Sequence, residues 1–294
     1  MRAAVVRTFG GPEAVEVVET ALPEPGARQI RIKVAGAALN PVDLGVRGGF
    51  FGGDKELGLG WDVSGTVDAV GADVPWSVGD QVVALYHGLT KDLGTHAEYV
   101  VVDADAVAEA PGTVDAIHAA TLPLNALTAV QALDILELTE GQSLLVTGAA
   151  GAVGGFAVQL AARRGVSVTG LARAGDEEFV RSLGAAEFTT APRAGAYDAV
   201  LDTAVLGEAA LEWVRDRGAY VGVRPGAHPG SVRGVRTASV SVTADGAQLA
   251  ELVGLVDEGV LTLRVAETYP LDAVAKAHAR LEGGGVRGRL VLVP

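Results

Sequence analysis

The sequence predicts an α/β protein of two domains, in which a β-rich region precedes a doubly wound parallel sheet. The chain has 294 residues and is 49% hydrophobic, which at ~100–200 residues per domain allows two domains with substantial cores. The first ~110 residues contain short strand candidates cut by Gly, Pro and Asp turns. From about residue 115 onward, strand and helix patterns alternate, as in parallel βαβ units.

The β-rich region contains short segments that are rich in valine and are separated by turns such as PEPGA, VGADVP and SVGD. These segments are AAVVRTF (3–9), VEVVET (15–20), QIRIKVAGAAL (29–39), GTVDAVG (65–71), DQVVALY (80–86) and HAEYVVVD (96–103). Many short strands at this spacing predict a barrel or a sandwich.

The alternating region begins with a helical pattern at 114–136 that is interrupted at Pro123. The expected strands after it are 142–148, 166–172, 186–190, 197–204, 218–223 and 235–242. The expected helices are 151–165, 176–184, 207–218 and 245–259. The remaining residues predict a strand at 261–271, an amphipathic helix at 272–283 and a final strand at 287–294.

The composition excludes several classes of function. The net charge of −13 repels phosphate backbones, so we expect no nucleic-acid partner. The chain has no cysteine, which excludes disulfides and thiolate zinc sites. It has neither the apolar core of a signal peptide nor a run of about 18 apolar residues, so we expect a cytoplasmic protein without a membrane partner.

A turn of small residues, TGAAGAVGG (147–155), joins a predicted strand to a predicted helix. Strand, glycine-rich turn and helix in this order is the context of a dinucleotide-binding fingerprint. Relative to G-x-G-x-x-G, Ala149 replaces the first glycine; Gly151 would let the backbone approach a pyrophosphate, and Gly154 would let the helix pack on the strand. The helix start favours an anion. The alternative is a small-residue turn without a ligand.

The end of the next strand indicates which nicotinamide cofactor binds. NAD sites usually carry Asp or Glu there, about 20 residues after the turn, to bind the ribose hydroxyls. This chain has Arg173 at that point and no acid. A guanidinium suits a 2′-phosphate, so the sequence favours NADPH over NAD. The alternative is a solvated arginine before the acidic first turn of the next helix.

Motifs along nearly the whole chain carry a family resemblance. They are ALNPVDLGVRGG (38–49), GLGWDVSGTVDAVG (58–71), VGDQVVAL (78–85), GTHAEYV (94–100), AATLPLNALTAVQAL (119–133), VTGAAGAVGGFAVQLA (146–161) and AHARLEGGGVRGRLVLVP (277–294). In this order they resemble the zinc-independent quinone oxidoreductase branch of the medium-chain dehydrogenase/reductase superfamily.

The resemblance implies a GroES-like β-barrel catalytic domain formed by residues 1–115 and 260–294. A doubly wound Rossmann domain, residues 116–259, is inserted between them, with the active site in the cleft. It also implies hydride transfer from NADPH to quinones or α,β-unsaturated carbonyls, and a homodimer joined through the edge of the Rossmann sheet. Residues 235–242 are our candidate edge strand, although an internal strand is equally compatible with the sequence.

The resemblance also predicts that no metal is bound. Zinc-using relatives carry a cysteine at the position of Asn40 and a His-Glu pair at Trp61-Asp62, so both positions lack soft ligands here. Without a metal, hydrogen-bond donors must stabilise charge on the substrate oxygen. Asn40 lies in the family's nicotinamide-facing loop; the alternative is an Asx-turn before Pro41.

Other polar residues have alternatives of the same kind. We expect Asp43 to cap the following turn rather than to act as an acid. Thr128 matches a family position near the nicotinamide and phosphates, or is a helix threonine bonded to its own backbone. Phe50 and Phe51 stand in a loop where relatives often have tyrosines, so the proton donor is left to Tyr86, His87 or Asn125.

The candidate site residues form three groups. The catalytic candidates are Asn40, Tyr86 and Asn125. The cofactor-binding candidates are Asn40, Thr128, Gly148, Ala150, Gly151, Ala152, Val153, Gly154, Ala172, Arg173 and Gly222. The substrate-pocket candidates are Phe50, Phe51 and Trp61, and the flanking Gly48, Gly49, Gly52 and Gly53 suggest a segment that closes over the substrate.

The sequence therefore predicts an NADPH-dependent reductase of quinones or α,β-unsaturated carbonyls. A second hypothesis is an enoyl-thioester reductase or a reductase dedicated to one natural product, because the tyrosines of the loop are absent. A third, of another class, is a catalytically idle NADPH-binding sensor or partner protein.

Overall fold

The computed structural model describes residues 1–52 and 56–294 and divides the chain into two compact units. Unit 1 comprises Met1–Leu124, Thr243–Gly259 and Leu263–Pro294, and unit 2 comprises Asn125–Val242 and Val260–Thr262. The segment Thr243–Gly259 differs from our expectation, because it belongs to unit 1. Its helix α7 (Gly246–Asp257) packs on β8 and η2, where a Cβ at Gly246 would lie 2.5 Å from the Val107 carbonyl oxygen.

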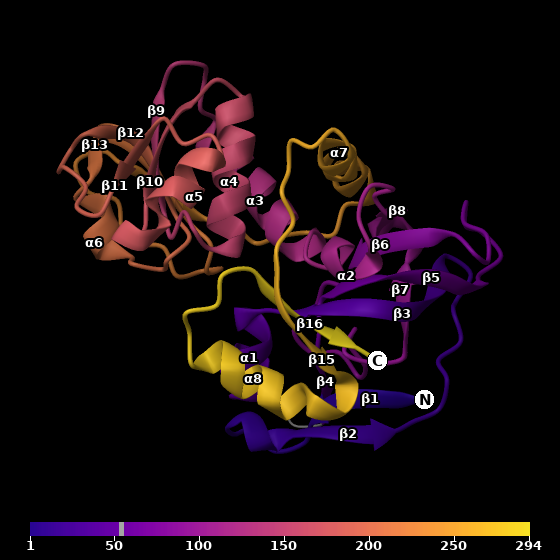
Figure 1. The fold of residues 1–294 in the computed structure, drawn as a ribbon. Coiled ribbons are helices and arrows are strands. Elements are labelled where there is room, and N and C mark those ends of the chain that lie inside the picture. The colour runs from indigo at the N-terminus through magenta and orange to yellow at the C-terminus, as the bar shows by residue number, and fades with distance from the viewer. Residues whose placement is uncertain (53–55) are drawn as a thin grey trace. The chain divides into compact units, whose positions relative to one another are not determined.

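Unit 1 contains a three-stranded sheet of order β2-β1-β4 and a seven-stranded sheet of order β15-β16-β3-β5-β6-β8, with β7 paired to β3 (Figure 1). Its strands are β1 (Arg2–Val6), β2 (Val15–Glu19), β3 (Gln29–Leu39), β4 (Leu57–Gly58), β5 (Asp62–Val70), β6 (Gln81–Leu85), β7 (Tyr99–Asp103), β8 (Val107–Glu109), β15 (Val265–Pro270) and β16 (Arg289–Val293). Its helices are η1 (Pro12–Ala14), α1 (Pro41–Arg47), η2 (Ala104–Ala106), α2 (Ala116–Ala119), α7, η4 (Leu271–Ala273) and α8 (Val274–Glu282).

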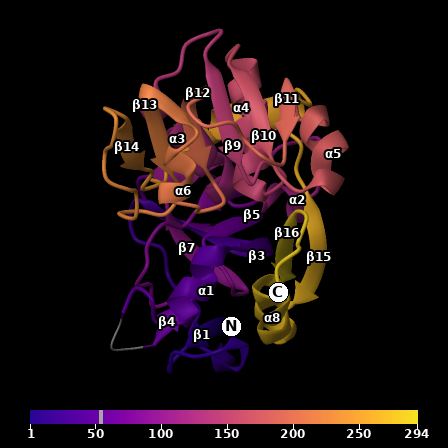
Figure 2. The same cartoon turned by 90° about the vertical axis from the view of Figure 1, so that its left-hand side faces the viewer.

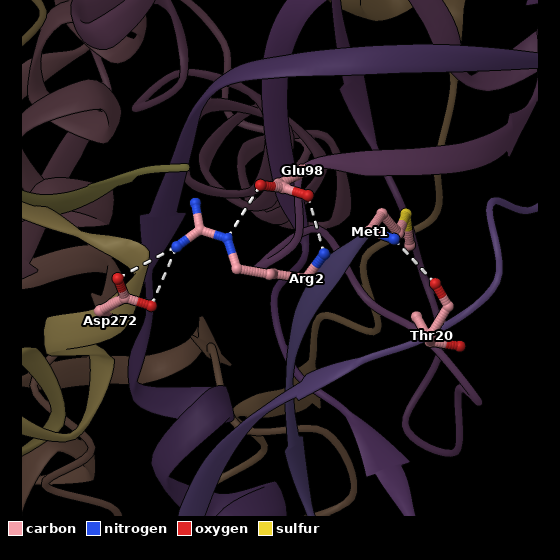
Figure 3. Close-up of polar contacts among 5 residues, drawn as sticks. All are labelled: Met1, Arg2, Thr20, Glu98 and Asp272. Carbon is pink, nitrogen blue, oxygen red and sulfur yellow. Dashed lines mark hydrogen bonds and ion pairs between the residues drawn. The ribbon is translucent and has the colours of Figure 1, made fainter.

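Polar contacts of Arg2 join distant parts of the chain within unit 1 (Figure 3). The Arg2 backbone N–H and its Nε donate to the Glu98 carboxylate at 2.8 and 2.9 Å, and its Nη1 donates to Asp272 at 3.0 Å. The Met1 amino group donates to the Thr20 carbonyl at 2.8 Å. Both ends of the chain therefore build one folding unit.

Two apolar clusters form the core of unit 1, because alternate residues of its strands face inward. One cluster joins β1, α1 and α8 to β16 and includes Leu39, Val46 and Leu290. The other lies among β3, β5, β6 and β7 and includes Ile32 and Val82. Short β-branched segments thus form the strands that the sequence predicts.

Unit 2 contains a six-stranded parallel sheet of order β11-β10-β9-β12-β13-β14, and Figure 2 shows β10, β9, β12 and β13 in succession. Its strands are β9 (Ser143–Thr147), β10 (Ser167–Leu171), β11 (Glu187–Thr189), β12 (Tyr197–Asp202), β13 (Val214–Gly222) and β14 (Arg236–Ser239). Its helices are α3 (Pro123–Leu136), which begins in unit 1, α4 (Ala152–Arg163), η3 (Ala174–Asp176), α5 (Glu177–Ser182) and α6 (Glu208–Leu211). The first strand, β9, lies inside the sheet, and the chain winds outward from it in both directions, as a doubly wound fold requires.

Three elements of the alternating region differ from the expectation or sharpen it. The helix expected at 207–218 is wrong beyond Leu211, because β13 begins at Val214, which is fully buried and pairs with Tyr197. Pro123 opens α3 instead of interrupting a longer helix, since proline suits the first helical turn. Strand β14 is at the edge of its sheet, where we placed residues 235–242 as a candidate edge strand.

Candidate functional site

The glycine-rich turn Gly148–Gly154 connects β9 to α4 and is shaped by the absence of side chains. Gly148 adopts φ +61°, a left-handed conformation that glycine tolerates best. A Cβ at Gly154 would lie 2.2 Å from the Gly148 carbonyl oxygen. The α4 helix can therefore start this close to the strand only if residue 154 has no side chain. Gly151, the N-cap of the twelve-residue helix α4, is exposed, and its N–H donates to the Gly148 carbonyl at 2.8 Å.

Ala149, which stands where the fingerprint has its first glycine, is fully buried. Its N–H donates to the Leu171 carbonyl at 3.1 Å, and its Cβ would lie 3.1 Å from a Cβ at Gly170. The methyl group thus fills space between β9 and β10 without closing the turn. Ala150, Ala152 and Val153 are partly exposed at the same helix start.

A buried carboxylate supports the turn from the neighbouring strands. Asp202, at the end of β12, accepts from the Thr147 hydroxyl at 2.6 Å, the Tyr220 hydroxyl at 2.8 Å and the Gly207 N–H at 2.8 Å. Burial, followed by the hydrogen bond to Asp202, raises the pKa of Tyr220, so its hydroxyl stays protonated and donates. The last residue of β9 is therefore fixed by side chains from β12 and β13.

The other predicted cofactor residues of unit 2 lie at the carboxyl ends of parallel strands, the edge where doubly wound sheets bind nucleotides. Arg173 follows β10, is exposed and caps η3; Ala172 precedes it and is partly exposed. Gly222 ends β13. On α3, Asn125 and Thr128 are buried at 1% and 7% exposure.

In unit 1, a buried polar cluster of Asn40, Asp43, Asp62 and Lys91 is joined through the backbone of Gly60. Asp43, at the third position of α1, accepts from the Asn40 N–H at 2.8 Å and from the Gly60 N–H at 2.9 Å. This is the capping role expected for Asp43.

The Asn40 side chain is directed to its neighbours in the protein. Its Nδ2 donates to Asp62 at 2.6 Å and to the Ala38 carbonyl at 3.3 Å. Both protons of the amide are thereby used, so the expectation that Asn40 donates to a cofactor or substrate oxygen would require one of these bonds to exchange. The geometry favours a role in fixing Asp62, which the sequence did not suggest.

Asp62 itself is fully buried and carries a perturbed pKa. Its other oxygen accepts from the Leu124 N–H at 2.6 Å. Burial raises the pKa of this carboxyl to about 7, against the opposing effects of its two hydrogen-bond donors and Arg289. A fully buried carboxyl with a pKa near neutrality marks this region as a functional site candidate.

Lys91 is a buried lysine that sequence reasoning missed. Its Nζ donates to the Gly60 carbonyl at 2.6 Å and to the Tyr86 carbonyl at 2.9 Å. Burial lowers its pKa to about 7, partly offset by the negative charges of Asp43 and Asp62. The composition could have drawn attention to Lys91. The chain has four lysines against nineteen arginines, so a lysine is the exception among its basic residues.

Tyr86 and His87 follow β6 and line a cavity of about 240 Å³ within unit 1, together with Asp103. Burial, followed by the charge of Asp103, raises the pKa of Tyr86, so its hydroxyl is a donor at neutral pH. Burial and then Lys91 lower the pKa of His87. The Trp61 ring is buried and meets the His87 ring edge-on at 5.3 Å.

Phe50 and Phe51 form an edge-to-face pair at 5.0 Å, with exposures of 62% and 38%. A Cβ at Gly45 would lie 2.9 Å from the Phe51 ring, so the pair rests on α1. Gly53, one of the four glycines of the proposed closing segment, lies outside the described residues. The pair offers the apolar surface that the sequence predicts.

Two buried histidines, His96 and His278, are a further feature that the sequence did not reveal. Their ring centroids are 6.3 Å apart, and His96 Nε2 lies 3.1 Å from the Ala38 carbonyl oxygen. Burial, then His96 and Arg47, lowers the pKa of His278 to about 3. Within residues 1–52 and 56–294, no group of three or more His, Cys, Asp or Glu residues is placed to hold a metal ion.

The predicted site residues thus divide between the units. Asn40, Trp61 and Tyr86 surround one polar and aromatic region of unit 1, whereas the turn, Arg173 and Gly222 lie along one edge of the unit 2 sheet. In the described part of the chain, no helix is long and apolar enough to span a membrane.

Comparisons with known proteins bear on both units. Residues 26–112 match the model for the alcohol dehydrogenase GroES-like domain, and residues 174–292 match the model for zinc-binding dehydrogenase. The chain is 33% identical to 2-methylene-furan-3-one reductase of Solanum lycopersicum, over 93% of this chain and 74% of that protein. It is 33% identical to the chloroplastic NADPH-dependent alkenal/one oxidoreductase of Arabidopsis thaliana, over 100% of this chain and 80% of that protein. Among solved structures, the quinone oxidoreductase from Coxiella burnetii has a TM-score of 0.88 and 29% identity, covering 100% of this chain and 99% of that one.

Proposed function

Because the chain belongs to the zinc-independent quinone oxidoreductase branch of the medium-chain dehydrogenase/reductase superfamily, we propose that it is an NADPH-dependent oxidoreductase that reduces quinones or α,β-unsaturated carbonyls. Relatives named for alkenal/one and furanone reduction support the substrate class. The observation that carries the proposal is the glycine-rich turn, in which a Cβ at Gly154 would lie 2.2 Å from the Gly148 carbonyl oxygen.

The chain's residues fit NADPH. The partly exposed Ala152 and Val153, in the first turn of α4, would hold the pyrophosphate through their backbone N–H groups. Arg173, exposed at the end of β10, would pair with the 2′-phosphate. When bound, NADPH supplies a hydride from its nicotinamide ring.

Other residues would bind the cofactor, orient the substrate and donate a proton. Asn125 and Thr128 on α3, with Ala150, Ala172 and Gly222, are the further proposed cofactor or catalytic contacts in unit 2.

In unit 1, Tyr86 is the proposed donor to the substrate oxygen, because its phenol stays protonated at neutral pH. Phe50, Phe51 and Trp61 are the proposed apolar contacts of the substrate, and Asn40 orients Asp62.

The proposed assembly is a homodimer joined through β14, a strand that pairs only with β13 among the described residues. Such an edge presents unpaired backbone groups to a second copy. The Val240 N–H donates to β13 at 2.9 Å, so by alternation the Thr237 N–H faces the free edge. Thr237→Pro would remove this donor, and sedimentation would then report a monomer if β14 forms the interface. We propose a cytoplasmic location, which cell fractionation tests.

NADPH oxidation with a panel of 2-alkenals, cyclic enones, quinones and enoyl-CoA thioesters tests the function. We expect rapid oxidation with the first three groups and little with the thioesters. Turnover of the thioesters alone would replace the proposal with an enoyl-thioester reductase. The proposal would be contradicted if the protein bound NADPH tightly but transferred hydride to none of these acceptors, in either steady-state or single-turnover assays.

A further inference from the structure

Lys91 joins two segments of unit 1 that carry candidate site residues. Its Nζ donates to the Gly60 carbonyl at 2.6 Å, just before β5, and to the Tyr86 carbonyl at 2.9 Å, just after β6. The side chain is 7% exposed. A lysine this buried is uncommon unless its charge is compensated, so its surroundings require an explanation.

Two aromatic rings bracket the ammonium group. Nζ lies 4.4 Å from the centroid of the Trp61 ring and 4.8 Å from that of the Tyr86 ring. Both distances are within the ~6 Å range of cation–π attraction, which is stronger where water is excluded. The ammonium group therefore contacts two carbonyl oxygens and two aromatic rings.

The charge of Lys91 is connected to the acidic groups through Gly60. The Gly60 N–H donates to Asp43 while its carbonyl accepts from Lys91. The charges of Asp43 and Asp62 favour the protonated amine, and burial opposes it. The other titratable groups that sense this charge are Tyr86 and the two nearby histidines, His87 and His96.

The Tyr86 and Trp61 rings connect Lys91 to the cavity of unit 1. Tyr86 lines the cavity itself, and Trp61 holds the His87 ring edge-on, which lines it as well. We propose that Lys91 is a positioning residue that, through the Trp61 and Tyr86 rings, fixes Tyr86 and His87 at this cavity, and that the cavity receives the flat conjugated part of the acceptor. This inference rests on the proposed function, since it names the site of that same substrate.

The cavity suits a small planar acceptor. Its volume of about 240 Å³ is below the ~300–1,000 Å³ of drug-sized sites. Leu85, Val102, Ala106 and Ala244 are its apolar lining residues, and Tyr86, His87, Asp103 and Thr243 are its polar ones. A single cation that bridges two carbonyls thereby organises the residues at this cavity.

Lys91→Met and Lys91→Arg test the proposal. Met keeps the length of the side chain without its charge, and Arg keeps the charge without the compact ammonium. For a cyclic enone we expect Lys91→Met to raise KM about tenfold or more with the NADPH dissociation constant unchanged, because only acceptor positioning is lost. Lys91→Arg should raise KM by less than Lys91→Met does. Lys276→Met, at an exposed lysine of α8, should leave KM unchanged.

Tryptophan fluorescence tests, without any turnover, whether the Lys91 ammonium group lies against the Trp61 ring. In a Trp76→Phe, Trp213→Phe background Trp61 is the sole tryptophan, and its emission should change with pH as the neighbouring amine titrates. Lys91→Met should abolish this change. His87→Ala provides a second activity test that does not alter the core: its KM increase should be non-additive with that of Lys91→Met, as expected for coupled residues.

Unchanged KM and unchanged Trp61 titration in Lys91→Met would overturn the inference, as would a loss of thermal stability alone. If the wild-type protein turned over no conjugated carbonyl, the proposed function would fail. The Trp61 titration would still decide whether Lys91 holds the rings.

Discussion

The glycine-rich turn of unit 2 and the buried polar cluster of unit 1 are built in opposite ways. In the turn, backbone atoms approach each other because side chains are absent, and the residues that make this close approach lie within Gly148–Gly154. In the cluster, side chains make the hydrogen bonds, and Asn40, Asp62 and Lys91 come together from three separate segments. A local feature of this kind is visible in a sequence, whereas a cluster assembled by tertiary packing is not. The following experiments test how far this contrast extends.

The largest expected effect is at Gly154. In Gly154→Ala the new Cβ would lie 2.2 Å from the Gly148 carbonyl oxygen, so α4 or the turn must move. We expect NADPH affinity to fall at least 100-fold and the free energy of unfolding to fall by about 3 kcal/mol, as for overpacking against rigid backbone. Fluorescence titration with NADPH and urea unfolding measure the two effects.

Gly254→Ala is the matched control, because Gly254 lies within helix α7 and a Cβ there would meet nothing within 4 Å. It should stabilise the protein by about 0.4–1 kcal/mol. Equal losses in both variants would mean that the turn is not specially constrained.

The second effect concerns the buried histidines near the polar cluster. His278 has a folded-state pKa of about 3 against about 6.5 when unfolded, so its contribution is fully present above pH 6.5 and is lost as pH falls toward 3. His278→Leu should therefore gain stability relative to wild type on acidification, by about 1.4 kcal/mol per pH unit, or about 2 kcal/mol between pH 6.5 and 5. Urea unfolding across this range gives the difference.

The exposed His228 provides the comparison for His278. His228→Leu controls for the replacement of a histidine by leucine at a site where no buried ring is removed. A stability difference between His278→Leu and wild type that did not change with pH would show that protons reach the His278 ring in the folded protein without cost.

The third effect separates the two nicotinamide cofactors. Arg173→Ala should weaken NADPH binding about tenfold, the equivalent of about 1.4 kcal/mol, because a charge-assisted contact to the 2′-phosphate is lost. NADH binding should not change, since NADH lacks that phosphate. Titrations with both cofactors measure the ratio.

Arg28→Ala, which removes an exposed arginine of unit 1, should affect neither titration. If Arg173→Ala weakened both cofactors equally, Arg173 would contribute only general positive charge.

The smallest effect is at the support of the turn. Tyr220→Phe removes one of the donors to Asp202 but leaves those of Thr147 and Gly207. We expect a loss of about 1 kcal/mol in the free energy of unfolding and an NADPH affinity close to that of wild type. In the described chain the Tyr99 hydroxyl has no hydrogen bond, so Tyr99→Phe should lower the free energy of unfolding by less. Equal losses in the two variants would show that the hydrogen bond from Tyr220 to Asp202 does not stabilise the turn.

The contrast also explains which parts of the fold could be predicted. The strands of both units follow from valine-rich segments and their turns, and the β9–α4 turn follows from its glycines. The helix expected through Val214 failed because Val214 and the neighbouring Trp213 pack in the core of unit 2, where tertiary contacts override the helical pattern. The backbone then takes φ +62° at Arg217, where β13 shifts its register against β12.

The candidate site divides along the same line. The positions of Gly151 and Arg173 at a helix start and a strand end could be read from the sequence. The bond from Asn40 to Asp62 could not, because it spans 22 residues and depends on β3 and β5 being neighbours. Lys91 was missed for the same reason, since its partner Gly60 lies 31 residues away.

The position of β16 has a consequence for how the chain is made. This strand, Arg289–Val293, lies between β15 and β3, so it enters a sheet whose other strands all precede it in the chain. Unit 2 is almost contiguous in sequence, from Asn125 to Val242, and can fold while the end of unit 1 is still to be translated. Until β16 arrives, β3 presents an unpaired edge along Ala37–Leu39, a template for wrong pairing with other chains. Chaperone demand during synthesis should therefore be concentrated in unit 1, although most of its strands precede unit 2 in the chain.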